Sequence, residues 1–149
     1  MHLPSIAWLA AAALAGCSVA ERGDFPASRA TWLVGLRGDP AEFELSGRRE
    51  VRVVYSLVNS SRQMQRLDFP TSQRLEVRMR GPDGANLFQW SEDRQFAPMA
   101  TAVVVNPGER LEHEAAVPTR DMVSGRVYTV EAVLPGYPET AATAELRPR

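Results

Sequence analysis

The sequence contains no lysine: its 17 basic residues are all arginine, and they nearly balance 18 acidic residues to give a net charge of −1. A near-neutral chain without a basic cluster lacks the electrostatic footprint of a nucleic-acid-binding protein, so we expect no nucleic-acid partner. Cysteine occurs once, at Cys17, and histidine twice, at His2 and His113. So few thiol and imidazole groups cannot form a disulfide framework or a zinc ligand set. We therefore predict no metal site and no cofactor.

Sequence patterns of catalytic sites are also scarce. The chain has no G-x-S-x-G nucleophile elbow, no glycine-rich phosphate loop and no EF-hand loop. His113 stands in a segment that alternates apolar and polar residues, where a lone histidine is usually packed or hydrogen-bonded. We therefore predict that the protein is not an enzyme and has no catalytic residues. An enzyme of unrecognised type that uses His113 is the alternative.

The apolar run near the N-terminus, from Ile6 to Leu14, is shorter than the roughly 20 residues that a bilayer-spanning helix needs. Such a run followed by small residues is typical of a secretory signal. The segment Leu14-Ala15-Gly16-Cys17 resembles the lipobox of bacterial lipoproteins, in which cleavage before the cysteine accompanies acylation of that residue. We therefore predict a lipoprotein signal peptide over residues 1–16 and lipidation at Cys17. An ordinary signal followed by a free thiol is the alternative.

The segment after the cysteine predicts where the protein resides. Residues 17–28 are polar and aperiodic, as in a tether, and we place the folded domain at residues 29–149. Two or three acyl chains on Cys17 would anchor the protein stably to a membrane. Ser18 follows the cysteine, whereas aspartate there would resemble an inner-membrane retention signal. We therefore expect a lipid-anchored protein of the bacterial cell envelope, on the outer membrane facing the periplasm if the host is Gram-negative.

The rest of the chain consists of short segments with alternating apolar residues, separated by turn signals. The predicted strands are residues 31–36, 41–45, 50–59, 65–69, 74–80, 86–90, 100–105, 110–117 and 126–134, with 142–147 as an added edge strand. No segment has a convincing helical period. This spacing predicts an all-β fold, an immunoglobulin-like antiparallel β-sandwich of seven to nine strands.

Several short motifs occur in a fixed order within this region. They are Asn59-Ser60, the run 69–73 (FPTSQ) leading into 75–77 (LEV), Asp83-Gly84, the run 88–96 (FQWSEDRQF), the turn 106–109 (NPGE) and the closing strand 125–130. Together they resemble the BsuPI family of intracellular proteinase inhibitors, over about residues 50–134. The resemblance implies a small immunoglobulin-like β-sandwich, and it implies a proteinase as partner where members are inhibitory.

The run FQWSEDRQF has two interpretations. Phe88 and Trp90 share one face of a strand, because side chains alternate with period two. The side chains of Ser91 and Asp93 favour a turn by bonding to nearby backbone N–H groups. Phe96 would then fold back beside Trp90. We interpret Trp90, Ser91, Asp93 and Phe96 as a structural corner, with a loop that contacts a partner directly as the alternative.

Two loops offer candidate contacts with a partner. Glu92 and Arg94 lie in the first, and Arg120 and Met122 lie in the second, where either side chain could enter a specificity pocket. Two functions stay open: a membrane-anchored inhibitor of an envelope or secreted proteinase, such as a serine proteinase, and a non-inhibitory immunoglobulin-like scaffold or recruitment module of the cell envelope. Both imply a protein partner, and we expect a monomer.

Overall fold

The structure is a computed structural model that describes residues 31–149. The predicted signal peptide, the tether and Cys17 lie outside the described residues, so their assignments stay predictions. Within residues 31–149 the chain contains strands, turns and loops and no helix. Accordingly, this part of the chain has no helix that could cross a membrane. The predicted all-β class is confirmed.

The described chain has ten strands rather than the predicted seven to nine. They are β1 (Trp32–Asp39), β2 (Glu42–Phe43), β3 (Glu50–Asn59), β4 (Gln65–Phe69), β5 (Glu76–Arg80), β6 (Asn86–Gln89), β7 (Thr101–Val105), β8 (Arg110–Pro118), β9 (Tyr128–Leu134) and β10 (Tyr137–Pro148). β2 has only two residues, so the strand predicted at residues 41–45 is longer than the one that forms. The bounds of β3 and β4 agree with the prediction to the residue.

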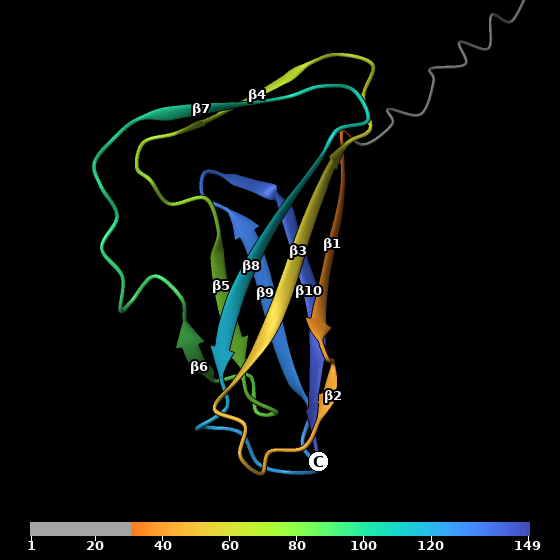
Figure 1. The fold of residues 1–149 in the computed structure, drawn as a ribbon, viewed down its shortest axis with the longest axis vertical. Helices are drawn as coiled ribbons and strands as arrows, with labels where there is room; N and C mark the ends of the chain where they lie inside the picture. Colours follow the sequence, from red (N-terminus) through yellow and green to blue (C-terminus); the bar gives the residue numbers. More distant parts are fainter. Residues whose placement is uncertain (1–30) are drawn as a thin grey trace, which may run out of the picture.

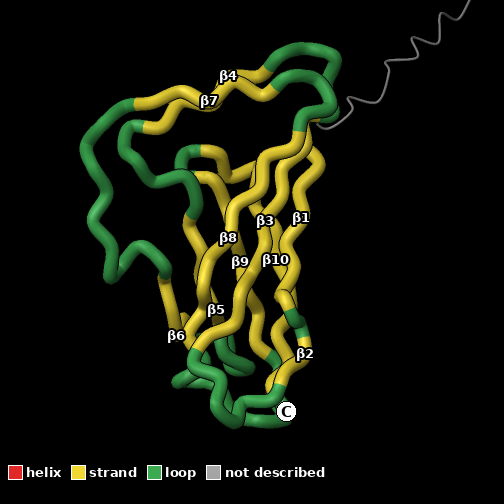
Figure 2. Tube along the Cα trace, viewed as in Figure 1, coloured by secondary structure: helices red, strands yellow, loops and turns green. Residues whose placement is uncertain are grey.

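Two layers and a ribbon make up the fold. The front layer has the strand order β1-β3-β8, and the back layer has the order β2-β10-β9-β5-β6. The strands β4 and β7 pair only with each other and form a ribbon across the top of both layers (Figures 1 and 2). Every pairing is antiparallel except that of β2 with β10, which is parallel. The β-sandwich is confirmed, and the immunoglobulin-like detail stays a prediction.

The core lies between the two layers, where the alternating residues of their strands meet. Val51, Val53, Tyr55 and Leu57 of β3 are all 0% exposed, as the period of that segment predicts. The back layer contributes a matching set, which comprises Val77, Met79, Tyr128, Val130, Ala132 and Leu134. Because each buried aliphatic side chain is worth about 1.5–3 kcal/mol, this interface supplies the main stabilisation of a chain without disulfides.

The last strand differs from the predicted edge strand at residues 142–147. β10 begins at Tyr137, pairs with β9 and continues to the short pairing with β2. Its first half is hard to recognise because a bulge interrupts the register between Tyr137 and Ala142 and because the buried residue there is the polar Thr140. The Thr140 hydroxyl donates to Tyr137 O at 2.7 Å and accepts from Leu134 N at 3.1 Å. Tyr55 Oη donates to Thr140 O at 2.8 Å, which ties the two layers together.

The buried Asn59 holds the top of the sandwich. Its side-chain amide donates to Gln63 O at 2.8 Å and to Val105 O at 2.9 Å, and its carbonyl oxygen accepts from Ser61 N at 3.0 Å. Its backbone N–H donates to Glu109 O at 3.1 Å. The Asn-Ser and Asn-Pro-Gly-Glu motifs therefore serve the fold, because they join the ends of β3 and β8 to the β4–β7 ribbon.

Candidate functional site

A shallow groove of about 440 Å³ lies on the side of the sandwich where β6 ends the back layer and β8 ends the front layer. Its lining residues are Glu50, Phe88, Trp90, Asp93, Arg94, Ala116, Pro118 and Arg120. Of the predicted partner contacts, Arg94 and Arg120 thus lie on one groove, although they come from different loops. We call this site the Trp90 groove.

The turn after β6 positions Trp90. Trp90 N donates to Val77 O at 2.8 Å, which continues the pairing of β5 and β6 by one residue. The turn then closes through backbone bonds, from Glu92 N to Gln89 O at 3.2 Å and from Arg94 N to Ser91 O at 3.3 Å. Because the backbone satisfies these groups itself, the predicted bonds from the side chains of Ser91 and Asp93 to backbone N–H groups are not the ones that close it.

The side chains of that corner have other partners. Ser91 Oγ accepts from Gln89 Nε2 at 3.1 Å, and Asp93 lines the groove. Phe96 packs against Trp90 with ring centroids 5.7 Å apart. The indole Nε1 of Trp90 is buried and has no acceptor among the described residues, so ring packing rather than hydrogen bonding holds this side chain.

Arg94 also contacts the Trp90 ring. Its guanidinium carbon lies 4.1 Å from the ring centroid, within the range of a cation–π interaction. This contact holds the arginine over the groove while leaving the residue exposed. Glu92 is also exposed, but it does not line the groove. The first predicted loop therefore places one of its two candidate contacts at the site.

The other two candidate contacts, Arg120 and Met122, lie in the loop after β8 and differ in exposure. The side chain of Arg120 is 71% exposed and pairs with Asp121 at 3.3 Å. Met122, by contrast, is only 7% exposed and belongs to the core. The expectation that Met122 could enter a partner's pocket is therefore wrong. The chain turns back there, with Met122 N donating to Thr119 O at 3.0 Å, and it buries the thioether.

The charge and shape of the groove suit recognition of a protein. Its floor includes the aromatic rings of Phe88 and Trp90, and its rim includes two acidic and two basic residues. Aromatic and arginine side chains are enriched at the centres of protein–protein interfaces. Such a mixed rim favours specific pairing with a partner over attraction of a polyanion.

His113 lies outside this groove. Its side chain is half-buried, and burial lowers the pKa of the imidazole, with a further lowering by the positive charge of Arg74. No three His, Cys, Asp or Glu side chains in residues 31–149 are grouped so that they could hold a metal ion. The expected absence of catalytic residues stays a prediction.

Three lining residues had no signal in the sequence. Glu50 and Pro118 are directly opposite each other in the pairing of β3 with β8, and Ala116 lies two residues before Pro118. They reach the groove through that register, which joins segments more than 60 positions apart. Knowledge of the pairing would have identified them, whereas local patterns could not.

Comparison with solved structures gives matches with low similarity. A β-glucosidase from Erythrobacter marinus is 13% identical with a TM-score of 0.44, and the match covers 79% of this chain but 15% of the enzyme. A FixG-related protein from Vibrio parahaemolyticus is 14% identical with a TM-score of 0.39, and the match covers 80% of this chain and 98% of that one. Below a TM-score of 0.5 these likenesses carry no argument.

Comparison with families is more informative. No curated protein matches the chain. The family model described as intracellular proteinase inhibitor, BsuPI, matches residues 40–139, well over half of the 149 residues. The matched region contains eight of the ten strands in full, from β2 to β9, together with the Asn59 network and every residue of the Trp90 groove. The chain therefore belongs to the BsuPI family of intracellular proteinase inhibitors.

Proposed function

We propose that this protein binds and inhibits a proteinase through the Trp90 groove. The observation that supports the proposal most is that Trp90, Arg94 and Arg120 meet on one exposed groove of a chain from an inhibitor family. A half-buried aromatic floor with arginines at its rim has the residue types that dominate binding energy at protein interfaces. The protein would act by occupying the proteinase, without catalysis of its own.

Both loops that line the groove are preorganised. The first is closed by backbone hydrogen bonds and by the packing of Phe96 on Trp90. The second is held by the buried Met122 and by Tyr128 Oη, which accepts from Val123 N at 2.7 Å. An inhibitor loop that is already ordered loses less entropy on binding. Packing thus takes the place of disulfides in holding the contact surface.

Arg120 is the side chain that we assign to the specificity pocket of the target. Among the residues that the structure describes, its ion pair is with the exposed neighbour Asp121, and such exposed pairs contribute little energy. A serine proteinase with an acidic specificity pocket would bind its guanidinium. Arg94 and Trp90 would then contact the surface beside that pocket.

The inhibition test uses the full-length chain against a panel of serine proteinases with acidic specificity pockets. We expect inhibition that weakens at least about tenfold in Arg120→Ala, as for loss of a charged hydrogen-bonded contact. Arg66→Ala is the matched control, because Arg66 is 65% exposed and pairs with nearby Asp68 at 2.9 Å, away from the groove. No inhibition at large molar excess would contradict the proposal and favour the scaffold function.

We also propose that Cys17 carries a lipid anchor that holds the domain at the cell envelope, so that the target is an envelope or secreted proteinase. The support is the Leu14-Ala15-Gly16-Cys17 segment. We expect the wild-type protein in the membrane fraction and the Cys17→Ser variant in the soluble fraction. Equal membrane association of the two would contradict the anchor without affecting the groove.

A further inference from the structure

The outer edge of β8 is a feature that the proposed groove does not use. β8 has nine residues and pairs on one side with β3. Among residues 31–149 no strand pairs with its other side, because β8 is the last strand of the front layer. A long edge strand with free backbone groups is a template for another strand.

The backbone groups that face this edge follow from the register. Asn59 N donates to Glu109 O at 3.1 Å, and Thr119 N donates to Arg49 O at 2.9 Å, at the two ends of the β3–β8 pairing. In an antiparallel pair, alternate residues direct their N–H and C=O groups to the same neighbour. The register between these ends is continuous. The residues of β8 that direct their N–H and C=O groups outward are therefore Arg110, Glu112, Glu114 and Ala116.

The back layer extends under this edge. Phe88 belongs to β6, and Trp90 follows the end of that strand; both rings are half-buried in the Trp90 groove. Ala116 and Pro118 of β8 line the same groove from the front layer. A strand added beside β8 would lie about 4.8 Å from it. Every second side chain of such a strand would point inward over Phe88 and Trp90. The added strand would thus complete the front layer, and apolar residues are favoured at its inward positions.

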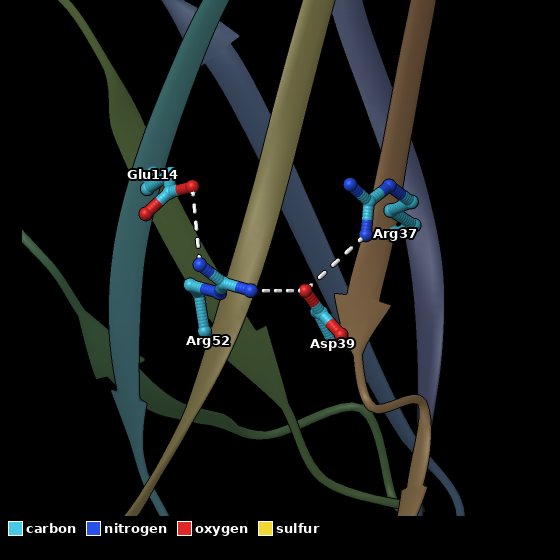
Figure 3. A network of polar contacts seen from close by, with 4 residues as sticks. All are labelled: Arg37, Asp39, Arg52 and Glu114. Atoms are coloured by element: carbon cyan, nitrogen blue, oxygen red, sulfur yellow. Dashed lines mark hydrogen bonds and ion pairs between the residues drawn. The ribbon is translucent and has the colours of Figure 1, made fainter.

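The charges on the outward face of β8 determine which residues are favoured at the outward positions of the added strand. Glu112 and Glu114 expose more than half of their side chains on β8. Glu114 accepts from Arg52 at 3.3 Å (Figure 3), and Glu112 pairs with Arg110 at 3.7 Å. Exposed pairs of this kind are weak and can exchange partners. Because opposite charges stabilise cross-strand pairs, basic residues are favoured at the outward positions.

We propose that the edge of β8 accepts an extended segment of the target proteinase, with alternating apolar and basic side chains, as a fourth strand of the front layer. This inference rests on the proposed function, because it takes the partner at the Trp90 groove to be a protein. A second copy of the chain suits the edge less well. Paired antiparallel about its centre, β8 would place Glu114 opposite Glu114 of the second copy, and like charges in that position are destabilising.

The test uses the full-length chain and two peptides of nine residues, the length of β8. One peptide alternates valine with lysine, and the other alternates valine with glutamate. Amide NMR spectra should shift along β8 with the valine–lysine peptide, and exchange of the Glu112 and Glu114 amide hydrogens should slow. The valine–glutamate peptide should bind at least about tenfold more weakly, since it places like charges opposite both glutamates.

Two variants of Glu114 distinguish the contribution of its backbone N–H to peptide binding from that of its side chain. Glu114→Pro removes an outward N–H, and proline is tolerated where the N–H of an edge strand faces solvent. Glu114→Ala removes the same charge and keeps the N–H. We expect the proline variant to bind the valine–lysine peptide about tenfold more weakly than the alanine variant, because proline lacks the N–H that the added strand would use. Equal binding by the two variants would overturn the proposal.

The remaining outcomes distinguish the two proposals. If Glu114→Pro inhibits proteinases as well as Glu114→Ala does, the edge proposal falls while the inhibitory function stands. If the valine–lysine peptide binds along β8 but no proteinase is inhibited, the edge proposal is supported and the inhibitory function falls. Shifts confined to β1, or dimerisation of the free chain through β8, would overturn the edge proposal.

Discussion

The two edges of the front layer differ in what lies beside them. β1 runs alongside β10 of the back layer (Figure 1), and a side-chain carbon at Gly38 would lie only 2.5 Å from the side chain of Leu146. The chain then adds β2 to β10 and closes this side. Within residues 31–149, β8 has no such neighbour, and the groove beside it leaves Phe88 and Trp90 half-buried.

The closed edge therefore contributes to the stability of the fold, whereas the open edge leaves side chains available for recognition of a partner. On the closed side the apolar residues are in the core, with Leu146 at 0% and Phe43 at 5% exposure. On the open side, aromatic rings and arginines lie where a partner can contact them. We therefore expect substitutions on the closed side to affect folding, and substitutions on the open side to affect binding more than folding.

The largest expected effect is on the closed side. Leu146→Ala should lower the free energy of unfolding by about 2–5 kcal/mol, because it creates a cavity at a fully buried site. Phe88→Ala on the open side should cost about 1–2 kcal/mol, because that ring is only partly buried. Urea unfolding of both variants measures the difference. Equal losses in the two variants would contradict the expected difference between the closed and the open side.

Trp90 should be the most sensitive residue of the open side. Trp90→Ala should cost about 2–3 kcal/mol, because it removes the packing partner of Phe96 and Arg94. Arg94→Ala should cost less than about 1 kcal/mol, as for an exposed cation–π contact, and Glu92→Ala should change stability little. Thermal unfolding distinguishes these cases. Equal, small effects at all three positions would contradict the corner interpretation.

Two glycine substitutions in β1 test how closely this strand packs against β10. In Gly38→Ala the added methyl would meet Leu146 and also the backbone of Ala41 at 3.0 Å, so we expect a loss of about 1–2 kcal/mol. Gly35→Ala is the control, because its methyl would meet only the hydroxyl of Ser56, which can rotate. A Gly38→Ala variant as stable as the wild type would contradict the close packing of β1 against β10.

The smallest expected effect depends on pH. Burial first, and then the charge of Arg74, lower the pKa of His113 below its ordinary value of 6.5. The unfolded chain therefore takes up the proton before the folded chain does. The contribution of neutral His113 is complete above pH 6.5, and it is lost as the pH falls through the folded-state pKa. His113→Gln should weaken the pH dependence of the free energy of unfolding below pH 6.5. An unchanged pH dependence would contradict a lowered pKa of His113 in the folded chain.

Alternation along the chain made much of the fold predictable. Val51 to Leu57 and Tyr128 to Leu134 show period two, and both segments are core strands as predicted. The start of β10 could not be predicted, because the buried Thr140 and a bulge break the pattern there.

The candidate site was predictable only in part. Arg94 and Arg120 are in loops that the sequence singles out, but their meeting depends on the register that sets Glu50 opposite Pro118. Met122 was misassigned for a similar reason. Whether a loop residue points outward or into the core depends on long-range packing, which local composition does not record.

The most direct test is amide hydrogen exchange of the full-length chain with and without the proteinase that it inhibits most strongly. We predict slower exchange in the complex at Glu112 and Glu114 of β8 and in the turn at Trp90, with β1 unchanged. Slower exchange confined to β1 and β10, with β8 unaffected, would contradict this prediction.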